Sequence, residues 1–325
     1  MADEKLLSKL RAIVLVVLLF GVLVIMSLMN PAFFQVSNLM SAVSLAAPLG
    51  FVALGMTLVL LIGGIDLSVG AMFAAGSLST AWSSSSGLPP VVSILFGVAV
   101  GALLGFINGV LVSSFNLPAI VVTLATLAVF GGCSLALSGG SSVPVGDELA
   151  FLGQGQVVGI PVPFLVFLVT GLVMWFCLKK TAFGEYVYGY GTNPEAAKYA
   201  PLSVKKLVIL VYMLAGILSS FGGCVFSAMV SSAKSNYGFG YEMLAVTIAV
   251  VGGTALVGGR GTIWGTILAT LFIAFLQNGM SISFVATEVQ TMVVGLALLV
   301  TAVLYKWAPI VHVQMLSNKT RNRSK

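Results

Sequence analysis

The feature that most constrains this chain is the absence of charge over two long stretches in its first half. No Asp, Glu, Lys or Arg occurs in residues 12–65 or in residues 67–146. A membrane-spanning helix needs about 20 mostly apolar residues, so each stretch must hold more than one span. Over all 325 residues 59% are hydrophobic and 7% charged, whereas soluble domains carry about 25% charged residues. The sequence therefore predicts an all-α, polytopic membrane protein.

Turn-forming residues and charges divide the chain into about ten predicted spans. Several of them are short, and the boundaries within residues 63–70 and 258–265 are the least defined. The ten segments are Ala12–Met29, Leu39–Ile62, Leu67–Trp82, Val91–Ser113, Ala119–Leu137, Val162–Leu178, Leu207–Val230, Met243–Val257, Ile263–Ser283 and Val289–Tyr305.

The positions of the basic residues predict how the chain is oriented, because basic loops remain in the cytoplasm. If the N-terminus is cytoplasmic, every Lys and Arg except Lys234 falls on the cytoplasmic side. Both termini and the loop 179–206 are thus predicted to be cytoplasmic, and the Gly- and Pro-rich loop 138–161 external. The apolar run behind the N-terminal basic residues is longer than the core of a cleaved signal peptide, which indicates an uncleaved first span. Because the basic residues follow this membrane pattern, nucleic-acid binding is not expected.

Catalytic chemistry is not expected from this chain. It contains no Gly-Lys pair, hence no phosphate-binding P-loop, and its one histidine, His312, provides neither a metal cluster nor a His-based triad. The stretch Leu137–Ser141 resembles a signature of transport ATPases, but it follows a span and is predicted to lie outside the cell. Cys133, Cys177 and Cys224 are odd in number and lie in apolar runs, which indicates small buried residues and no disulfide framework.

Asp66 is the one acid in residues 5–146. An ionisable group near membrane depth suggests an ion or substrate role. The following residues, Leu67 and Ser68, favour instead a role for Asp66 as the N-cap of the next helix, where its carboxylate would accept backbone N–H bonds. The two roles are compatible.

Two further groups of residues inside the spans admit two interpretations each. Four glycines, Gly97, Gly101, Gly105 and Gly109, recur every four residues and predict a helix face for close packing, with a direct part in substrate passage as the alternative. Polar side chains form the second group, which either lines a hydrophilic path or provides hydrogen bonds between helices. Its members are Asn108, Thr123, Thr126, Thr254, Gln277 and Asn278.

The loop 179–206 contains a short stretch with helix signals. Pro194 suits a first turn, Glu195 suits the start of a helix, and Pro201 suits a stop. The stretch Asn193–Tyr199 is therefore predicted to be a short helix outside the membrane and a candidate docking element. The residues assigned to docking are Asn193, Pro194, Glu195, Ala196, Ala197 and Lys198.

The segments Gly63–Gly70 and Gly258–Gly265 show a weak internal sequence similarity. Each is a Gly-flanked charge between apolar runs. Transporters often contain such paired interruptions of their helices, although chance is an alternative in a chain with 37 glycines.

Five ordered motifs in this chain resemble those of the membrane subunits of bacterial ABC importers for ribose and related sugars. They are Gly55–Thr57 leading to Gly64–Gly70, then Asn116–Thr126, Gly191–Ala197, Gly240–Glu242 followed by Gly252–Thr254, and Gly258–Gly261. The residues assigned to the family motif are Gly64, Asp66, Ser68, Gly70, Gly258, Gly259, Arg260 and Gly261.

The resemblance implies a single permease domain over residues 1–325, with the ABC importer permease fold of about ten helices, in the bacterial inner membrane. It also implies three partners: a second permease, identical or homologous; cytoplasmic ATPases, which would bind the ATP and magnesium; and an extracytoplasmic substrate-binding protein. This chain would bind no cofactor, and Asn193–Tyr199 would be the helix that couples to the ATPase. Pro201 and the pair Lys205 and Lys206 depart from the pattern of many relatives.

The alternative is a self-sufficient carrier that uses an ion gradient, with Asp66 as the coupling carboxylate. Ion-coupled carriers usually bury several ionisable groups along their pathway. A dedicated docking loop and the scarcity of acids therefore favour the ATP-driven importer.

Overall fold

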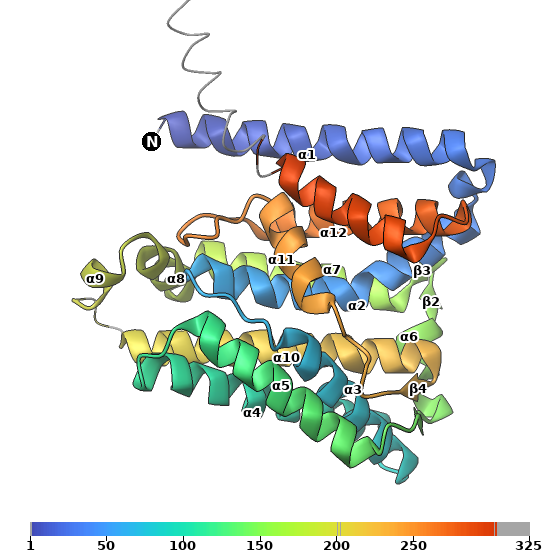
Figure 1. Cartoon of the computed structure of the whole chain (residues 1–325), viewed down its shortest axis with the longest axis horizontal. Coiled ribbons are helices and arrows are strands. Elements are labelled where there is room, and N and C mark those ends of the chain that lie inside the picture. The colour runs from blue at the N-terminus through green and yellow to red at the C-terminus, as the bar shows by residue number, and fades with distance from the viewer. Residues whose placement is uncertain (1, 200, 202, 302, 304–325) are drawn as a thin grey trace, which may run out of the picture.

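The computed structural model describes residues 2–199, 201, 203–301 and 303, with side chains from residue 13 onward. Some predicted features lie outside the described residues, namely the end of the last span at Tyr305, the basic residues from Lys306 onward, and His312. The described part is a bundle of helices with short strands at one end (Figure 1).

The helices of the bundle are connected by short turns and two small strand pairs. In chain order they are α1 (Ala2–Met29), η1 (Pro31–Phe34), α2 (Val36–Leu61), α3 (Val69–Ser85), α4 (Pro90–Ser114), α5 (Ala119–Ser138), η2 (Asp147–Leu149), α6 (Ala150–Gln154), α7 (Val162–Lys180), α8 (Ala182–Thr192), α9 (Pro194–Ala197), α10 (Val204–Val230), α11 (Tyr241–Val251) and α12 (Ile263–Ile282). A further apolar helix spans Thr287–Thr301. Strand β1 (Val143–Pro144) pairs with β4 (Ser232–Ala233), and β2 (Gln156–Val157) pairs with β3 (Ile160–Pro161), both antiparallel.

Each of the ten predicted spans overlaps a helix in the described part of the chain. Of the described helices, 6 are long and apolar enough to cross a membrane: α2, α4, α5, α7, α10 and α12. Three shorter apolar stretches of helix are also described, namely Ile13–Met29 within the 28-residue α1, the whole of α11, and Thr287–Thr301. The structure thus supports a polytopic all-α protein, while the number of complete spans stays a prediction.

Two predicted spans have different bounds in the structure. The segment predicted to begin at Leu67 becomes helical only at Val69, because the residues before it form a turn around Asp66. The segment predicted to run to Val257 ends as a helix at Val251. There Gly252 and Gly253 follow, and Gly253 has a φ of 92°, a conformation that a right-handed helix does not allow. Hydropathy did not reveal either break, because the residues beyond it are still apolar.

Helix α2 forms the centre of the bundle. It is apolar on every side and buried along most of its length, as expected for a helix surrounded by other helices. One of its faces packs with α11 and α12, and another with α7 and α10, while α1 packs against α12. Helix α10 also packs against α3 and α4.

The four glycines of α4 lie where α4 packs against α10. A Cβ atom at Gly105 would overlap the carbonyl oxygen of Tyr212, and one at Gly109 would lie 2.6 Å from the Cα of Ile209. Ser220 of α10 lies against Gly101, and Thr80 of α3 lies against Gly97. Only glycine allows the backbones to approach this closely.

The bundle has two distinct ends (Figure 1). At one end, called the α9 end here, lie the start of α1 and the helices α8 and α9. At the opposite end, called the strand end, lie the strand pairs and α6. Ser84 at the strand end donates to Glu148 Oε1 (2.6 Å), and this hydrogen bond lowers the pKa of the Glu148 carboxyl. The Gly- and Pro-rich loop 138–161 thus contains ordered short elements.

The cysteines differ from the prediction that all three are buried. Cys224 is buried, Cys177 is partly buried, and Cys133 on α5 is exposed. An apolar run shows that a helix is in the membrane but not which of its faces contacts other helices, so the prediction was wrong for Cys133.

Candidate functional site

The link between α2 and α3 carries a fully buried carboxylate. Asp66 Oδ1 accepts hydrogen bonds from the backbone N–H of Ser68 (2.9 Å) and from Ser68 Oγ (2.6 Å). Asn108 on α4 donates from Nδ2 to the same Ser68 Oγ (2.7 Å). Two motif residues and one predicted path residue therefore share one network, which together with Tyr212 is called the Asp66 cluster below.

The sequence suggested Asp66 as the N-cap of α3, but Asp66 does not occupy that position. The N-cap residue is Ser68, because the helix starts at Val69. The carboxylate reaches the N–H two residues ahead of it, which is a turn that precedes the helix.

Three oxygen atoms of the Asp66 cluster have no hydrogen-bond partner among the described residues. They are Asp66 Oδ2, Asn108 Oδ1 and the hydroxyl of Tyr212 on α10. Tyr212 is fully buried, and its hydroxyl lies 2.7 Å from the place where a Cβ atom at Gly64 would be. An unpaired buried polar group costs about 1–3 kcal/mol, so a set of three marks this cluster as a candidate functional site.

A hydrogen bond connects helix α5 to the segment between α2 and α3 that carries Asp66. Thr123 Oγ1 donates to the carbonyl oxygen of Ile65 (3.1 Å) and also to Ala119 in its own helix (2.9 Å). Thr126 bonds only weakly within α5, to Thr123 (3.4 Å). Of these two predicted path residues, Thr123 thus contacts the link that carries Asp66.

The first turn of α3 contacts the segment that leads into α11. Gly70 lies against the carbonyl oxygen of Gly238, and a Cβ atom at Gly70 would come within 2.5 Å of Glu242 Oε2. Glu242 is buried, and its Oε1 accepts from the N–H of Gly240 (3.2 Å). The motif that contains Glu242 therefore lies beside the motif that contains Gly70.

The two similar Gly-flanked segments, Gly63–Gly70 and Gly258–Gly265, lie side by side at the α9 end. The N–H of Gly259 donates to the carbonyl oxygen of Leu61 (2.8 Å). A Cβ atom at Gly258 would lie 2.9 Å from both Gly63 N and Gly191 O, and Gly258 has a φ of 89°. These contacts join the end of α2, the segment before α12 and the end of α8, and they are called the glycine junction below.

Residues on both sides of Gly258 and Gly259, together with Tyr188 of α8, add further contacts at the glycine junction. Tyr188 of α8 donates from its hydroxyl to the carbonyl oxygen of Gly261 (3.0 Å), and burial raises the pKa of Tyr188. The carbonyl of Arg260 accepts from the N–H of Ala255 (2.8 Å), and the Arg260 side chain is exposed. Thr254 is buried beside Gly261.

The predicted docking stretch forms the short helix α9. Asn193 accepts a hydrogen bond from the N–H of Ala196 (3.0 Å) and so caps the helix. Glu195 pairs with Lys198 in the same chain (2.7 Å), which raises the pKa of the Lys198 amine. Tyr199 is 92% exposed. Helix α9 thus protrudes at the end of the bundle (Figure 1) and offers its side chains to a partner.

The remaining predicted path residues lie elsewhere. Asn278 on α12 exchanges amide hydrogen bonds with Asn38 on α2 (2.9 and 3.1 Å). Asn38 lies near the start of α2, at the strand end, whereas the Asp66 link follows the other end of that helix. Gln277, also on α12, is partly buried and takes part in neither of these two hydrogen-bond networks. The polar residues of the spans therefore do not form one continuous line.

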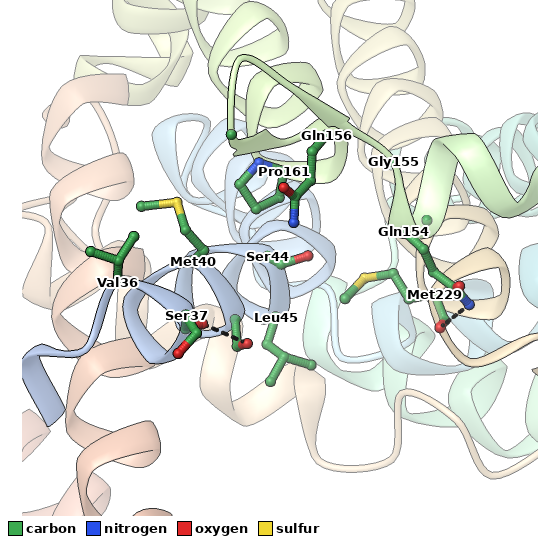
Figure 2. Close-up of a pocket in the computed structure, with 13 residues that line it drawn as sticks. Val36, Ser37, Met40, Ser44, Leu45, Gln154, Gly155, Gln156, Pro161 and Met229 are labelled. Atoms are coloured by element: carbon green, nitrogen blue, oxygen red, sulfur yellow. Dashed lines mark hydrogen bonds between the residues drawn. The ribbon is translucent and has the colours of Figure 1, made fainter. Parts of the chain in front are cut away.

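A pocket opens at the strand end, between the first turns of α2, α6 and the β2–β3 hairpin (Figure 2). Its volume is about 750 Å³, within the range of small-molecule sites. Hydroxyl and amide groups line it together with apolar side chains, and no lining residue is charged. The polar lining residues are Ser37, Ser41, Ser44, Gln154 and Gln156.

The comparisons with known proteins give the family. Residues 38–302 match the model of the branched-chain amino acid transport system / permease component family. The chain belongs to this family. The ribose import permease of Bacillus subtilis is 37% identical over 88% of this chain and 90% of its own length. The D-allose transport permease of Escherichia coli is 32% identical over 89% and 87%, respectively. An autoinducer 2 import permease of Photorhabdus laumondii is 32% identical over 93% and 91%. No solved structure gives a significant match.

Membership in this family identifies the chain as a membrane permease subunit of an ABC importer, and not as an enzyme. The importer interpretation of the sequence is thereby confirmed over the carrier driven by an ion gradient.

Proposed function

We propose that this permease carries a monosaccharide or a similar small polar molecule into the cell across the bacterial inner membrane. The α9 end would face the cytoplasm, and the strand end the outside. Two permeases, identical or homologous, would form the path, two cytoplasmic ATPases would bind ATP and magnesium, and an extracytoplasmic binding protein would deliver the substrate. The lipid bilayer surrounds this assembly.

The observation that carries the proposal is the connection from α9 to the Asp66 cluster. Helix α9 protrudes from the bundle, and α8 links it to the glycine junction. The junction contacts the end of α2 directly ahead of the link that holds Asp66. A movement of α9 against an ATPase would therefore reach a buried polar cluster inside the bundle.

The substrate class rests on the relatives and on the lining of the strand-end pocket. The relatives named above import ribose, D-allose and autoinducer 2. Uncharged hydroxyl and amide groups, such as those of Ser41 and Gln154, suit a neutral ligand rich in hydroxyl groups.

Labelling of single cysteines tests the orientation. Gly155 is a poor position, because a Cβ atom there would overlap the carbonyl oxygen of Phe151. Val158 is better, since it is 96% exposed at the hairpin turn and its φ of 52° is unfavourable for valine. In a protein whose Cys133 and Cys177 are replaced by serine, Val158→Cys is expected to react with an impermeant reagent from outside. Reaction only from the cytoplasm would overturn the orientation.

Purification with and without partners tests whether a separate subunit hydrolyses the ATP. The chain alone is expected to hydrolyse no ATP, because its sequence has no P-loop lysine to hold the phosphates. Expressed with its neighbouring genes, it is expected to co-purify with an ATPase whose activity is stimulated by the binding protein. Sustained ATP hydrolysis by the purified chain alone would refute the proposal that a separate ATPase supplies this activity.

A further inference from the structure

An apolar groove runs along the outside of the bundle between α7 and α10. Both helices pack against α2, and Leu58 of α2 forms part of the floor between them. The groove has a volume of about 480 Å³. The lining side chains of its walls, among them Val173 and Cys177 on α7 and Leu210 and Leu214 on α10, are almost all apolar. It is called the α7–α10 groove below.

The length of the groove matches one half of a bilayer. Its walls extend over Val169–Leu178 on α7 and Leu210–Leu218 on α10. With a rise of 1.5 Å per residue these stretches are about 12–14 Å long, whereas half of the hydrocarbon core measures about 15 Å. The groove reaches Thr181 and Phe183 at the α9 end, so it lies within the leaflet on that side.

Lysines stand on both sides of the mouth of the groove. Lys180 follows Cys177 by three residues, and Lys206 precedes Leu210 by four, so each lysine continues the groove face of its helix. Both are exposed. Among the described residues of the loop 179–206, the acids are Glu185 and Glu195, and Glu195 is paired with Lys198. The mouth is therefore electropositive.

The neighbouring lysines point elsewhere. Lys179 Nζ lies 5.4 Å from the centre of the Tyr188 ring on α8. Lys205 precedes Ile209 by four residues, and Ile209 packs against Gly109 of α4. These two lysines carry the same charge near the same membrane surface but do not share the groove face, which makes them matched controls.

We propose that the α7–α10 groove binds an acyl chain of an anionic phospholipid from the cytoplasmic leaflet, with the lipid phosphate between Lys180 and Lys206. An acyl chain fits the apolar walls and their one-leaflet length, and the negative head group fits the two lysines. The inference depends on the α9 end being cytoplasmic, as proposed above, and is independent of the transported substrate.

Lipid titration of the purified full-length chain, followed by native mass spectrometry, tests the inference. Phosphatidylglycerol is expected to bind more tightly than phosphatidylcholine with the same acyl chains. The double variant Lys180→Gln, Lys206→Gln is expected to bind phosphatidylglycerol about 30-fold more weakly and to lose its preference for phosphatidylglycerol over phosphatidylcholine. The control Lys179→Gln, Lys205→Gln is expected to keep the preference. Equal binding of both lipids by the wild-type chain, or an equal loss in the two double variants, would overturn the proposal.

A second pair of variants tests the groove separately from the charge. Val173→Trp would place a large ring in the groove, whereas Leu172→Trp adds the same ring on a neighbouring exposed position outside it. Only Val173→Trp is expected to reduce the binding of both lipids.

Two further results would contradict the proposal. One is displacement of the lipid by an equal concentration of glycerol 3-phosphate, and the other is a second copy of the chain that occupies the groove. Transport is not part of these measurements, so their failure would leave the proposed function standing.

Discussion

The variant Gly191→Ala is expected to melt at a lower temperature than the wild-type protein and to lose most of its ATP-driven uptake. A Cβ atom at Gly191 would overlap the carbonyl oxygen of Leu61 and the backbone nitrogen of Gly259. Both are backbone atoms, so no side chain can rotate away. Overpacking of this kind costs about 1–3 kcal/mol. Because the glycine junction connects α8 with the Asp66 link, we expect its displacement to impair transport as well as stability.

Gly189→Ala is the matched control for this prediction. Gly189 lies in the same helix, two residues earlier, and nothing lies within 4 Å of a Cβ atom there. Alanine is favoured over glycine in a helix by about 1 kcal/mol, so this variant is expected to be unchanged or slightly more stable. Thermal melting in detergent and uptake in cells would be measured for both variants. Equal effects of the two substitutions would show that the close contact at Gly191 is unimportant.

The variant Ala197→Glu is expected to abolish uptake and the association with the ATPase while leaving insertion into the membrane intact. Ala197 is a half-buried residue of α9 beside the Glu195 and Lys198 pair. A new carboxylate would add bulk and an unpaired charge to a contact that loses its water when the ATPase docks. Such a change typically costs several kcal/mol.

Ala197→Ser provides the comparison at the same position, because it adds a small uncharged group. It is expected to keep ATPase association and most of the uptake. The amount of ATPase that co-purifies with each variant from equal amounts of membrane gives the measurement. If the Ala197→Glu protein retains its ATPase and transports like wild type, α9 is only a solvated connection.

The sequence allowed the helical bundle to be predicted because long apolar runs leave few alternatives. It also placed the short helix α9, since Pro194 and Glu195 are local signals of a helix start that need no tertiary contact. Helix α8 was missed. Gly184, Gly189 and Gly191 make that segment a poor helix former. Of the three, Gly184 packs against the backbone of Leu178 and Gly191 against the glycine junction, and neither contact is visible in the sequence.

The candidate site was predictable in part. Asp66, Asn108 and Thr123 were each singled out as polar groups in an apolar sequence, and the structure brings them to one link. Tyr212 was missed, although a tyrosine in the middle of a span is itself an unusual polar group. The sequence could not show that α10 places its hydroxyl over Gly64, because that contact depends on how two distant helices pack.

Uptake into proteoliposomes shows directly whether this permease imports a monosaccharide at the expense of ATP. The chain would be reconstituted with its co-purifying ATPase and binding protein, and a panel of labelled monosaccharides that includes ribose and allose would be offered from the binding-protein side. We expect at least one sugar to accumulate, and only when ATP, the ATPase and the binding protein are all present. Accumulation by vesicles that contain this chain alone, driven by an ion gradient without ATP, would contradict the proposed function.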